Sequence, residues 1–317
     1  MSISVPIAPT TITANPTQFA DAFKTFLPLP ATLDQPLEEA IRHVLGNPGS
    51  LIRPRMVYQV GTACGLDQVP AKDLAIALEY FHTASLVFDD LPCMDNALER
   101  RGVHCVHFAF GEAGAILTAL ALINRAYALT WRAIFTVSRQ RQERSLKYVE
   151  ACLGVEGLLN GQSLDLNYTT LPHNRETTER IARGKTVSLI RLTLVLPALL
   201  GDASEREIQL LERIALYWGL GYQMVDDLKD LLGSPTEAGK TVARDLVLDR
   251  PNAAAVLGVH GAVNRLTRFI RIGDRALSRL LNTRREMSFL ENLRNELEEE
   301  LVRVTQNALE RNSGERL

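Results

Sequence analysis

Apolar residues recur every three to four positions along most of this chain, and strict alternation of apolar and polar residues is missing. Between residues 72 and 90, for example, Leu74, Leu78, Phe81 and Phe88 fall on one side of a helix. The same periodicity predicts helices over 34–45, 51–64, 72–90, 111–134, 140–159, 176–200, 205–232, 252–260, 262–281 and 287–311. With neither strand alternation nor a short repeat, the pattern predicts an all-α protein that forms a single large helical bundle.

Helix-breaking residues and composition shifts indicate the boundaries. GNPG at 46–49 ends the first helix, and Pro197 predicts a kink or break inside 176–200. Residues 1–20 carry no charge and are rich in Thr, Pro and Ser. We therefore expect a flexible leader over 1–30 and one helical domain over 31–317. The segment 111–134 is apolar on nearly all sides, which predicts a central helix.

Composition narrows the function classes. The chain has 317 residues, of which 46% are hydrophobic and 23% charged, and its net charge is −2. This balance predicts no general attraction to nucleic acid. No charge-free apolar run approaches the roughly 20 residues that span a bilayer, so we expect no membrane span. Neither a zinc site nor a disulfide framework is indicated, because no CxxC pair occurs among the cysteines. Reduced thiols predict a cytoplasmic protein; the four are Cys64, Cys93, Cys105 and Cys152.

Two acidic clusters follow apolar helical stretches. LVFDDLPCMDNALERRG at 86–102 holds Asp89, Asp90 and Asp95, and VDDLKDLLG at 225–233 holds three more aspartates. Clustered carboxylates repel one another, and holding them near apolar surface is costly unless cations neutralise them. Hard oxygen ligands suit Mg²⁺, which shares its coordination with phosphate oxygens. The pair of clusters therefore predicts a site for a diphosphate carried by magnesium, whereas a single cluster would be equally consistent with surface acids at a helix end.

Spacing predicts how each cluster folds. Asp226 and Asp230 are four positions apart and share one face of a helix, with Asp227 beside them. Asp89 and Asp95 are six apart and would diverge on an unbroken helix. Pro92 interrupts the helix between them, so we expect the chain to turn and bring Asp95 back towards Asp89.

Several motifs, in order, resemble those of the trans-isoprenyl diphosphate synthases. HTASLVFDDLPCMDNALERRG resembles the family's first aspartate-rich motif in its DDxxxxD form, and GYQMVDDLKDLLG the second. FGEAGAIL (110–117), GQSLDL (161–166), KTVSLI (185–190) and GKTVARDL (239–246) are similar to the segments between and after them. HTAS, PCMDNA and LERRG are most similar to geranylgeranyl diphosphate synthases of carotenoid pathways.

The resemblance implies a bundle with a central apolar cavity and a typically homodimeric enzyme. It implies three Mg²⁺ ions, held by Asp89, Asp95 and Asp226 with Asp90, Asp227 and Asp230 in support. Residues that contact the allylic diphosphate would be Arg100, Lys185 and Lys240, and Thr186 and Gln223 would flank the allylic cation. Isopentenyl diphosphate would be bound by His82, Arg101 and Arg53. The residue five before the first aspartate lines the growing tail, so the small Ala84, with Ser85 next to it, implies growth past farnesyl, to geranylgeranyl.

One loop departs from the family pattern. Family members carry GGKRxRP, whose lysine and first arginine bind isopentenyl diphosphate, whereas this chain reads PGSLIRP at 48–54. Ser50 and Leu51 replace those cations, and Arg53 and Pro54 remain. Two lost charge-assisted contacts, each worth on the order of 1.5–3 kcal/mol, would weaken that substrate by orders of magnitude. VHCVH (103–107) also replaces a KPT-like segment, and Arg250 stands near a usual lysine.

Three functional interpretations remain open at this point. In the first, a prenyltransferase binds isopentenyl diphosphate through Arg53, Arg55, Arg101 and His82. In the second, an enzyme similar to a class I terpene synthase ionises the allylic diphosphate and quenches the cation without isopentenyl diphosphate. In the third, the chain is a non-catalytic partner subunit, although intact metal ligands argue against that role. The resemblance favours prenyl transfer.

Overall fold

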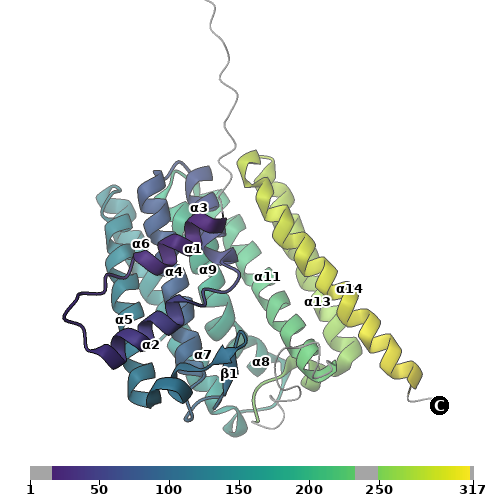
Figure 1. Ribbon diagram of the computed structural model, residues 1–317. Coiled ribbons are helices and arrows are strands. Elements are labelled where there is room, and N and C mark those ends of the chain that lie inside the picture. The colour runs from purple at the N-terminus through teal and green to yellow at the C-terminus, as the bar shows by residue number, and fades with distance from the viewer. Residues whose placement is uncertain (1–15, 233–248, 315–317) are drawn as a thin grey trace, which may run out of the picture.

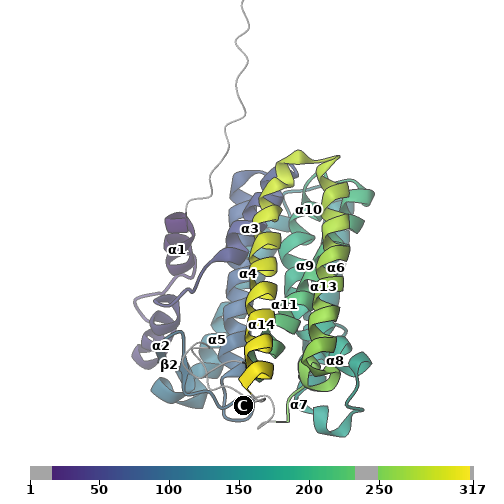
Figure 2. The same cartoon turned by 90° about the vertical axis from the view of Figure 1, so that its right-hand side faces the viewer.

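A computed structural model describes residues 16–232 and 249–314, and their side chains over 17–232 and 249–306. Across these ranges the chain is an α-helical bundle with a single small hairpin, as Figures 1 and 2 show. The helices of the first half are α1 (Pro16–Thr25), α2 (Gln35–Leu45), α3 (Ile52–Ala63), α4 (Gln68–Asp89), α5 (Val106–Ile134), α6 (Arg139–Leu153) and α7 (Leu158–Leu166). The second half holds α8 (Arg175–Ala182), α9 (Ser188–Leu194), α10 (Leu196–Leu200), α11 (Glu205–Leu232), α13 (Ala253–Leu281) and α14 (Leu290–Gly314). The predicted all-α fold is confirmed.

Short irregular elements connect these helices. They are the two-residue strands β1 (Glu99–Arg100) and β2 (Val103–His104), the 3₁₀ turns η1 (Tyr168–Thr170) and η3 (Arg285–Phe289), and one π-helical turn, η2 (Arg183–Val187). The expected break near Pro197 occurs between α9 and α10, with the proline in the first turn of α10. Two predicted helices divide further. Segment 140–159 ends at Gly154, and 176–200 contains the π turn, which no period in the sequence indicates.

The core has two connected halves, separated in Figure 1 from left to right. One half packs α1 to α5 around α4, and its largest fully buried side chains include Tyr80, Leu74 and Leu122. The other packs α13 and α14 on α11, with Trp218 and Phe269 inside. Helices α4 and α11 are therefore the central helices of the two halves. Each carries one acidic cluster towards its carboxyl end.

Capping residues stabilise the first turns of α11 and α13, two long helices of the second half. Ser204 and Glu207 form a reciprocal capping box at the start of α11: the Ser204 N–H donates to Glu207 Oε2 at 2.8 Å, and the Glu207 N–H donates to Ser204 Oγ at 3.3 Å. Asn252 caps α13 by accepting from the Ala255 N–H at 2.9 Å. These caps set where α11 and α13 begin, and so set the register between the two helices.

The expected leader is wrong for residues 16–30. Helix α1 lies against α3 and α4, and Phe19 and Phe23 are buried in the first half of the core. The Tyr80 hydroxyl donates to the Phe23 carbonyl at 2.7 Å, which ties α1 to α4. An uncharged composition rich in Thr and Pro concealed an apolar helix face. Residues 1–15 lie outside the described part of the chain.

Helix α5 is more exposed than its composition predicts. Phe108, Ile116, Leu117 and Leu120 are each at least 40% exposed, while the opposite face packs on α4 and α2. By length and composition alone, this is the one helix in the described ranges that meets the criterion for crossing a membrane. The core helix of a soluble protein meets the same criterion, so the expectation of no membrane span stays a prediction.

Candidate active site

The first acidic cluster sits where α4 ends. The helix stops at Asp89, three residues before Pro92, and the chain then turns tightly. The Asp95 N–H donates to the Asp89 carbonyl at 2.9 Å, and the Asn96 N–H donates to the Leu91 carbonyl at 3.0 Å. The predicted return of Asp95 towards Asp89 is confirmed. Asp89 also accepts a 2.9 Å bond from the Gln162 amide of α7.

A hairpin that the sequence pattern did not predict carries the two arginines that follow. Arg101 and Gly102 connect β1 to β2, and both have positive φ, at 56° and 77°. A two-residue turn of this kind suits the twist of the strands and favours glycine. Arg100 therefore points back to Asp90, donating from Nε at 2.8 Å and from Nη2 at 2.6 Å. Asp90 is buried by this ion pair, so its role here is to hold Arg100.

The second cluster occupies two sides of α11. Asp226 is exposed, Asp230 is half-buried, and Asp227 is buried. Asp227 accepts bonds from the Gln223 amide at 2.9 Å and from the Ala253 N–H at 2.8 Å. Asp227 thus connects α11 to the start of α13 and fixes the orientation of the Gln223 amide.

The π-helical turn presents Lys185 and Thr186. An inserted residue of this kind widens the helix and often marks a functional position. Lys185 pairs with Asp165 of α7 at 2.9 Å, and the Thr186 hydroxyl donates to Gln223 Oε1. The predicted neighbours Thr186 and Gln223 therefore lie in direct contact.

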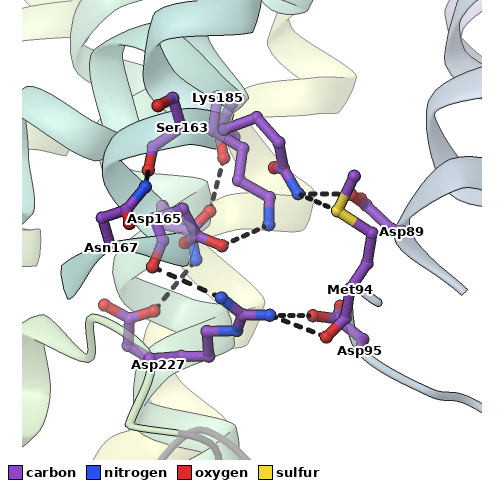
Figure 3. A network of polar contacts seen from close by, with 12 residues as sticks. Asp89, Met94, Asp95, Ser163, Asp165, Asn167, Lys185 and Asp227 are labelled. Atoms are coloured by element: carbon purple, nitrogen blue, oxygen red, sulfur yellow. Dashed lines mark hydrogen bonds and ion pairs between the residues drawn. The ribbon is translucent and has the colours of Figure 1, made fainter. Parts of the chain in front are cut away.

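These elements enclose a polar pocket of about 610 Å³, its open mouth included. Asp95 from the first cluster and Asp227 from the second both line this pocket, together with Lys185, Thr186 and Gln223. Figure 3 shows Asp89, Met94 and Asp95 on one side, facing Asp165, Lys185 and Asp227. The two halves of the predicted site are therefore brought together. The apolar cavity that the resemblance implies stays a prediction.

Arg250, three residues before α13 begins, bridges the pocket. Its Nη2 donates to the Met94 carbonyl at 2.8 Å and to Asp95 Oδ1 at 3.2 Å. Its Nη1 lies 3.5 Å from the Asp165 carbonyl. The position where the family usually has lysine thus keeps a cation within the site.

Charge is concentrated and poorly solvated around Asp89. The pKa of Asp89 is raised to about 6, mainly by burial, with the charges of Asp95 and Asp165 also raising it and that of Lys185 lowering it. Burial acts to lower the pKa of Lys185, but the neighbouring Asp89 and Asp165 outweigh it and raise that pKa. Cation and carboxylates therefore stabilise each other's charged forms.

The chemistry of the donors fits magnesium, although their present partners are protein groups. Within the described residues, no three His, Cys, Asp or Glu side chains stand together in a metal-binding arrangement. Asp89 and Asp95 nevertheless supply hard oxygen atoms at the turn that follows α4, and their mutual repulsion is what a divalent cation relieves. Asp226 offers an exposed carboxylate one helical turn from Asp230.

A second cluster of charge surrounds His82 on α4. The His82 pKa is lowered to about 2, mainly by burial and in addition by the positive charges of Arg53, Arg101 and Arg100, so the ring is neutral. Glu79, one turn earlier on α4, is only 2% exposed. Burial raises its pKa to about 7, against the charges of Arg53 and Arg101. The predicted group of Arg53, His82 and Arg101 is thus brought together, with Glu79 added.

The loop that departs from the family pattern lies beside this cluster. Arg101 donates to the Asn47 carbonyl at 3.0 Å, and a Cβ on Gly49 would collide with the Arg101 guanidinium. Ser50 is exposed, but Leu51 is 6% exposed and belongs to the core. Leu51 also has a φ of 53°, a left-handed conformation that begins α3. Its side chain is therefore a packing residue.

Comparison with known proteins settles the family. The polyprenyl synthetase family matches residues 34–276 of the chain. The chain belongs to the polyprenyl synthetase family. This membership confirms the resemblance to trans-isoprenyl diphosphate synthases.

The relatives with similar sequences are named as geranylgeranyl or farnesyl diphosphate synthases. A putative geranylgeranyl pyrophosphate synthase 8 of Arabidopsis thaliana is 36% identical over 72% of this chain and 64% of that protein. Farnesyl diphosphate synthase of Bacillus subtilis is 32% identical over 78% of this chain and 85% of its own length. The chain thus spans somewhat less than two thirds of the plant protein.

Solved structures share the fold. A farnesyl/geranylfarnesyl diphosphate synthase of Zymomonas mobilis superposes with a TM-score of 0.75 at 27% identity, covering 89% of this chain and 97% of that one. A geranyltransferase of Helicobacter pylori, complexed with magnesium and isoprenyl diphosphate, gives 0.74 at 25% identity, covering 96% and 100%. The bundle is therefore that of the isoprenoid synthases.

The other predicted residues lie on α4 or beyond α11. Ala84 is fully buried on α4 and Ser85 is half-buried, its hydroxyl donating to the His82 carbonyl at 2.8 Å. Lys240 lies outside the described residues. Sequence reasoning missed Glu79, and it included Gln162 and Asp165 only as parts of the GQSLDL motif, without a role for either. Asp165 follows Gln162 by three positions on one helix, which was the available signal for its facing the same pocket.

Proposed function

We propose that this protein ionises an allylic prenyl diphosphate with the help of Mg²⁺ and joins the resulting cation head-to-tail to isopentenyl diphosphate. The observation that carries this proposal is the shared pocket, in which Asp95 of one cluster and Asp227 of the other face Lys185 and Thr186. The names of the relatives support short-chain prenyl transfer. The Helicobacter relative, whose structure contains magnesium and an isoprenyl diphosphate, supports the cofactor and the substrate class.

Magnesium would be held by Asp89, Asp95 and Asp226, with Asp90 and Asp230 nearby and three ions expected. When bound, it neutralises the diphosphate that leaves as the carbon–oxygen bond breaks. Lys185 sits among these carboxylates and keeps its proton, so it is available to bind a phosphate oxygen. Arg100 is oriented by Asp90, and Lys240 is the third proposed diphosphate contact.

Thr186 and Gln223 are proposed to stabilise the allylic cation. The Gln223 amide N–H₂ donates to Asp227, which turns its carbonyl oxygen towards the Thr186 hydroxyl. Two polar oxygens held in this way present negative potential without a nucleophile that would trap the cation. Proton loss to diphosphate would complete the reaction, so no further base is required.

Isopentenyl diphosphate is proposed to bind at the cluster of Arg53, Arg101 and His82. Two guanidinium groups supply the positive charge, while neutral His82 contributes a hydrogen bond rather than a charge. Glu79 is near enough to Arg53 and Arg101 for their charges to lower its pKa, and we propose that it helps to position them. This arrangement would replace the two cations absent at Ser50 and Leu51.

The same absence supports the terpene synthase-like alternative. Leu51 is buried in the core and Ser50 is exposed, so neither residue offers a cation to a second diphosphate. A non-catalytic partner subunit is the remaining alternative. The paired Lys185–Asp165 and Thr186–Gln223 contacts argue for a working pocket.

Product analysis separates the three functions. Purified full-length protein with Mg²⁺ is incubated with geranyl or farnesyl diphosphate, with and without isopentenyl diphosphate, and products are separated by mass. Prenyl transfer predicts a longer diphosphate only when both substrates are present, and loss of turnover in EDTA. A hydrocarbon or alcohol formed without isopentenyl diphosphate establishes the terpene synthase function. No turnover of either allylic substrate establishes the partner-subunit role.

The product is proposed to be geranylgeranyl diphosphate. Ala84 is small, and Phe81, one turn further from Asp89 on α4, is the next bulky side chain on that helix. Its ring meets Tyr127 of α5 edge-on at 4.9 Å between centroids, and Tyr127 meets Trp131 at 5.4 Å. This aromatic row would end the growth of a prenyl tail that passes Ala84.

A homodimer is proposed through α5. Ile116, Leu117 and Leu120 form an exposed apolar face at helical spacing. Exposed apolar side chains grouped on one face of a helix are typical of a protein–protein contact surface. Leu117→Asp with Leu120→Asp should convert a dimer to a monomer in analytical ultracentrifugation, and a wild-type monomer at micromolar concentration would rule the dimer out.

The cytoplasm is the proposed location, because none of the four cysteines is paired and Cys64, Cys105 and Cys152 are buried. Fractionation of cells that express the natural protein tests this location. We propose neither nucleic-acid binding nor a membrane-spanning segment for this protein.

A further inference from the structure

A second pocket lies behind the π-helical turn. It encloses about 560 Å³, open solvent at its mouth included. The lining includes Arg180, Arg183 and Arg191 with Glu156 and Asn160. We call it the arginine pocket. It shares no lining residue with the catalytic pocket.

The charges in the arginine pocket do not cancel. Arg191 is already neutralised, because its Nε and Nη2 donate to Glu212 at 2.8 and 3.0 Å. Arg180 and Arg183 are exposed, three positions apart on adjoining helical turns, and no contact within the described residues satisfies either guanidinium. Glu156 supplies one carboxylate against these two cations. The excess positive charge favours an anion, and paired guanidinium groups match the oxygens of phosphates.

The two pockets adjoin along η2, where α7 packs closely against it. Gly161 of α7 and Gly184 of η2 both line the arginine pocket, and a Cβ on Gly184 would stand 2.6 Å from the Cα of Gly161. Such contact requires glycine on both sides. Lys185, which lines the catalytic pocket, follows Gly184 directly. Because Lys185 follows Arg183 by two positions, a displacement of Arg183 or Gly184 is expected to move Lys185 as well.

We propose that the arginine pocket binds a diphosphate group through Arg180 and Arg183, and that its occupancy shifts Lys185 and weakens allylic substrate binding. The diphosphate has two possible sources, inorganic diphosphate or the head of a prenyl diphosphate. The regulatory part rests on the proposed function, because the proposed reaction releases inorganic diphosphate. The binding part does not depend on turnover.

A titration without metal tests the binding. In EDTA the catalytic pocket presents its carboxylates and repels anions, and Arg53→Ala with Arg101→Ala removes the proposed isopentenyl diphosphate site. Calorimetry of this full-length background protein should therefore report one inorganic diphosphate per chain at the arginine pocket, and the variants below are compared in that background. Arg180→Ala with Arg183→Ala should weaken binding at least tenfold, and Glu156→Gln should tighten it several-fold. Arg279→Ala, an exposed arginine near the end of α13, is the matched control and should bind as wild type. Amide exchange over 157–164 and 183–187 should slow on binding.

Opposite outcomes overturn the proposal. Affinity unchanged in the double arginine variant, or abolished by Lys185→Ala instead, would place the anion in the catalytic pocket. Absence of binding by both inorganic diphosphate and geranyl diphosphate would remove the site altogether. Comparing the two anions identifies the source, since tighter binding of geranyl diphosphate assigns the pocket to a prenyl diphosphate head.

Steady-state kinetics tests the regulation. With Mg²⁺, inorganic diphosphate should inhibit wild type in a mixed manner against the allylic substrate, and the double arginine variant in a purely competitive one. Competitive inhibition of both proteins refutes the coupling. A protein that binds diphosphate in EDTA but turns over no prenyl substrate refutes the proposed function while leaving the binding site established.

Discussion

Arg250 donates a hydrogen bond to Asp95 across 155 positions of sequence, at 3.2 Å. The same nitrogen donates to the Met94 carbonyl at 2.8 Å. One guanidinium therefore fixes both the backbone and the carboxylate of the turn that follows α4. Arg250→Ala should raise the KM for the allylic diphosphate by roughly 10- to 100-fold, since charge-assisted hydrogen bonds contribute about 1.5–3 kcal/mol.

The matched variant is Arg250→Lys, which keeps the charge but lacks the planar fork that reaches two acceptors. Its KM should fall between wild type and the alanine variant. Wild-type KM in Arg250→Ala would show that the bridge has no part in substrate binding.

The changed loop can be tested one residue at a time. Ser50→Lys adds a cation at an exposed position beside Arg101 and should lower the KM for isopentenyl diphosphate. Adding Leu51→Arg buries a charge in the core and should lower the free energy of unfolding by several kcal/mol, as measured by urea denaturation. A double variant as stable as wild type would mean that position 51 turns outward. An unchanged KM in Ser50→Lys would show that the loop does not face that substrate.

Product length should respond to two positions on α4. Ala84→Phe narrows the proposed path of the tail and should shorten the product. Phe81→Ala removes one ring from the Phe81–Tyr127–Trp131 row and should lengthen it. Chromatography of the dephosphorylated products measures both effects. If both variants make the wild-type product, the end of the cavity is formed elsewhere.

Glu79 predicts a dependence of stability on pH. Its pKa of about 7 lies above the ordinary value of 4.5, so the folded chain holds a proton that the unfolded chain releases. The free energy of unfolding should therefore fall as pH rises through the window from 4.5 to 7, by at most about 3 kcal/mol. Glu79→Gln cannot ionise, so it should flatten this dependence in urea titrations from about pH 5 to about pH 8.

The exposed Glu296→Gln on α14 serves as the control and should keep the wild-type slope. A Glu79→Gln profile parallel to that of wild type would mean that Glu79 is ionised across the whole range.

Periodicity predicted the helices because each buries one face, and it predicted α11 to its end residues. It failed at α1, where the spacing of Phe19, Phe23 and Phe26 was present but the surrounding composition argued against a helix. Periodicity also did not predict the π turn and the Arg101–Gly102 hairpin, because each depends on one or two local dihedral angles rather than on a repeated pattern.

The site followed the same division. The aspartates and Lys185 were predicted because they occur in short contiguous sequence motifs. No role was predicted for Asp165 or Glu79, because their partners, Lys185 and the arginines near His82, come together only when α7 and α3 dock. Pairing between distant side chains leaves little trace in a single sequence.

Helix α1 has a practical consequence for anyone who prepares this protein. Trimming the recombinant chain to begin at residue 31 would strip away the two phenyl rings that seal α3 and α4, leaving Tyr58 and Tyr80 open to water. The truncated protein is expected to aggregate on purification, although every proposed catalytic side chain is still present. Helix α1 is thus expected to be needed for solubility, although it holds none of the proposed catalytic residues.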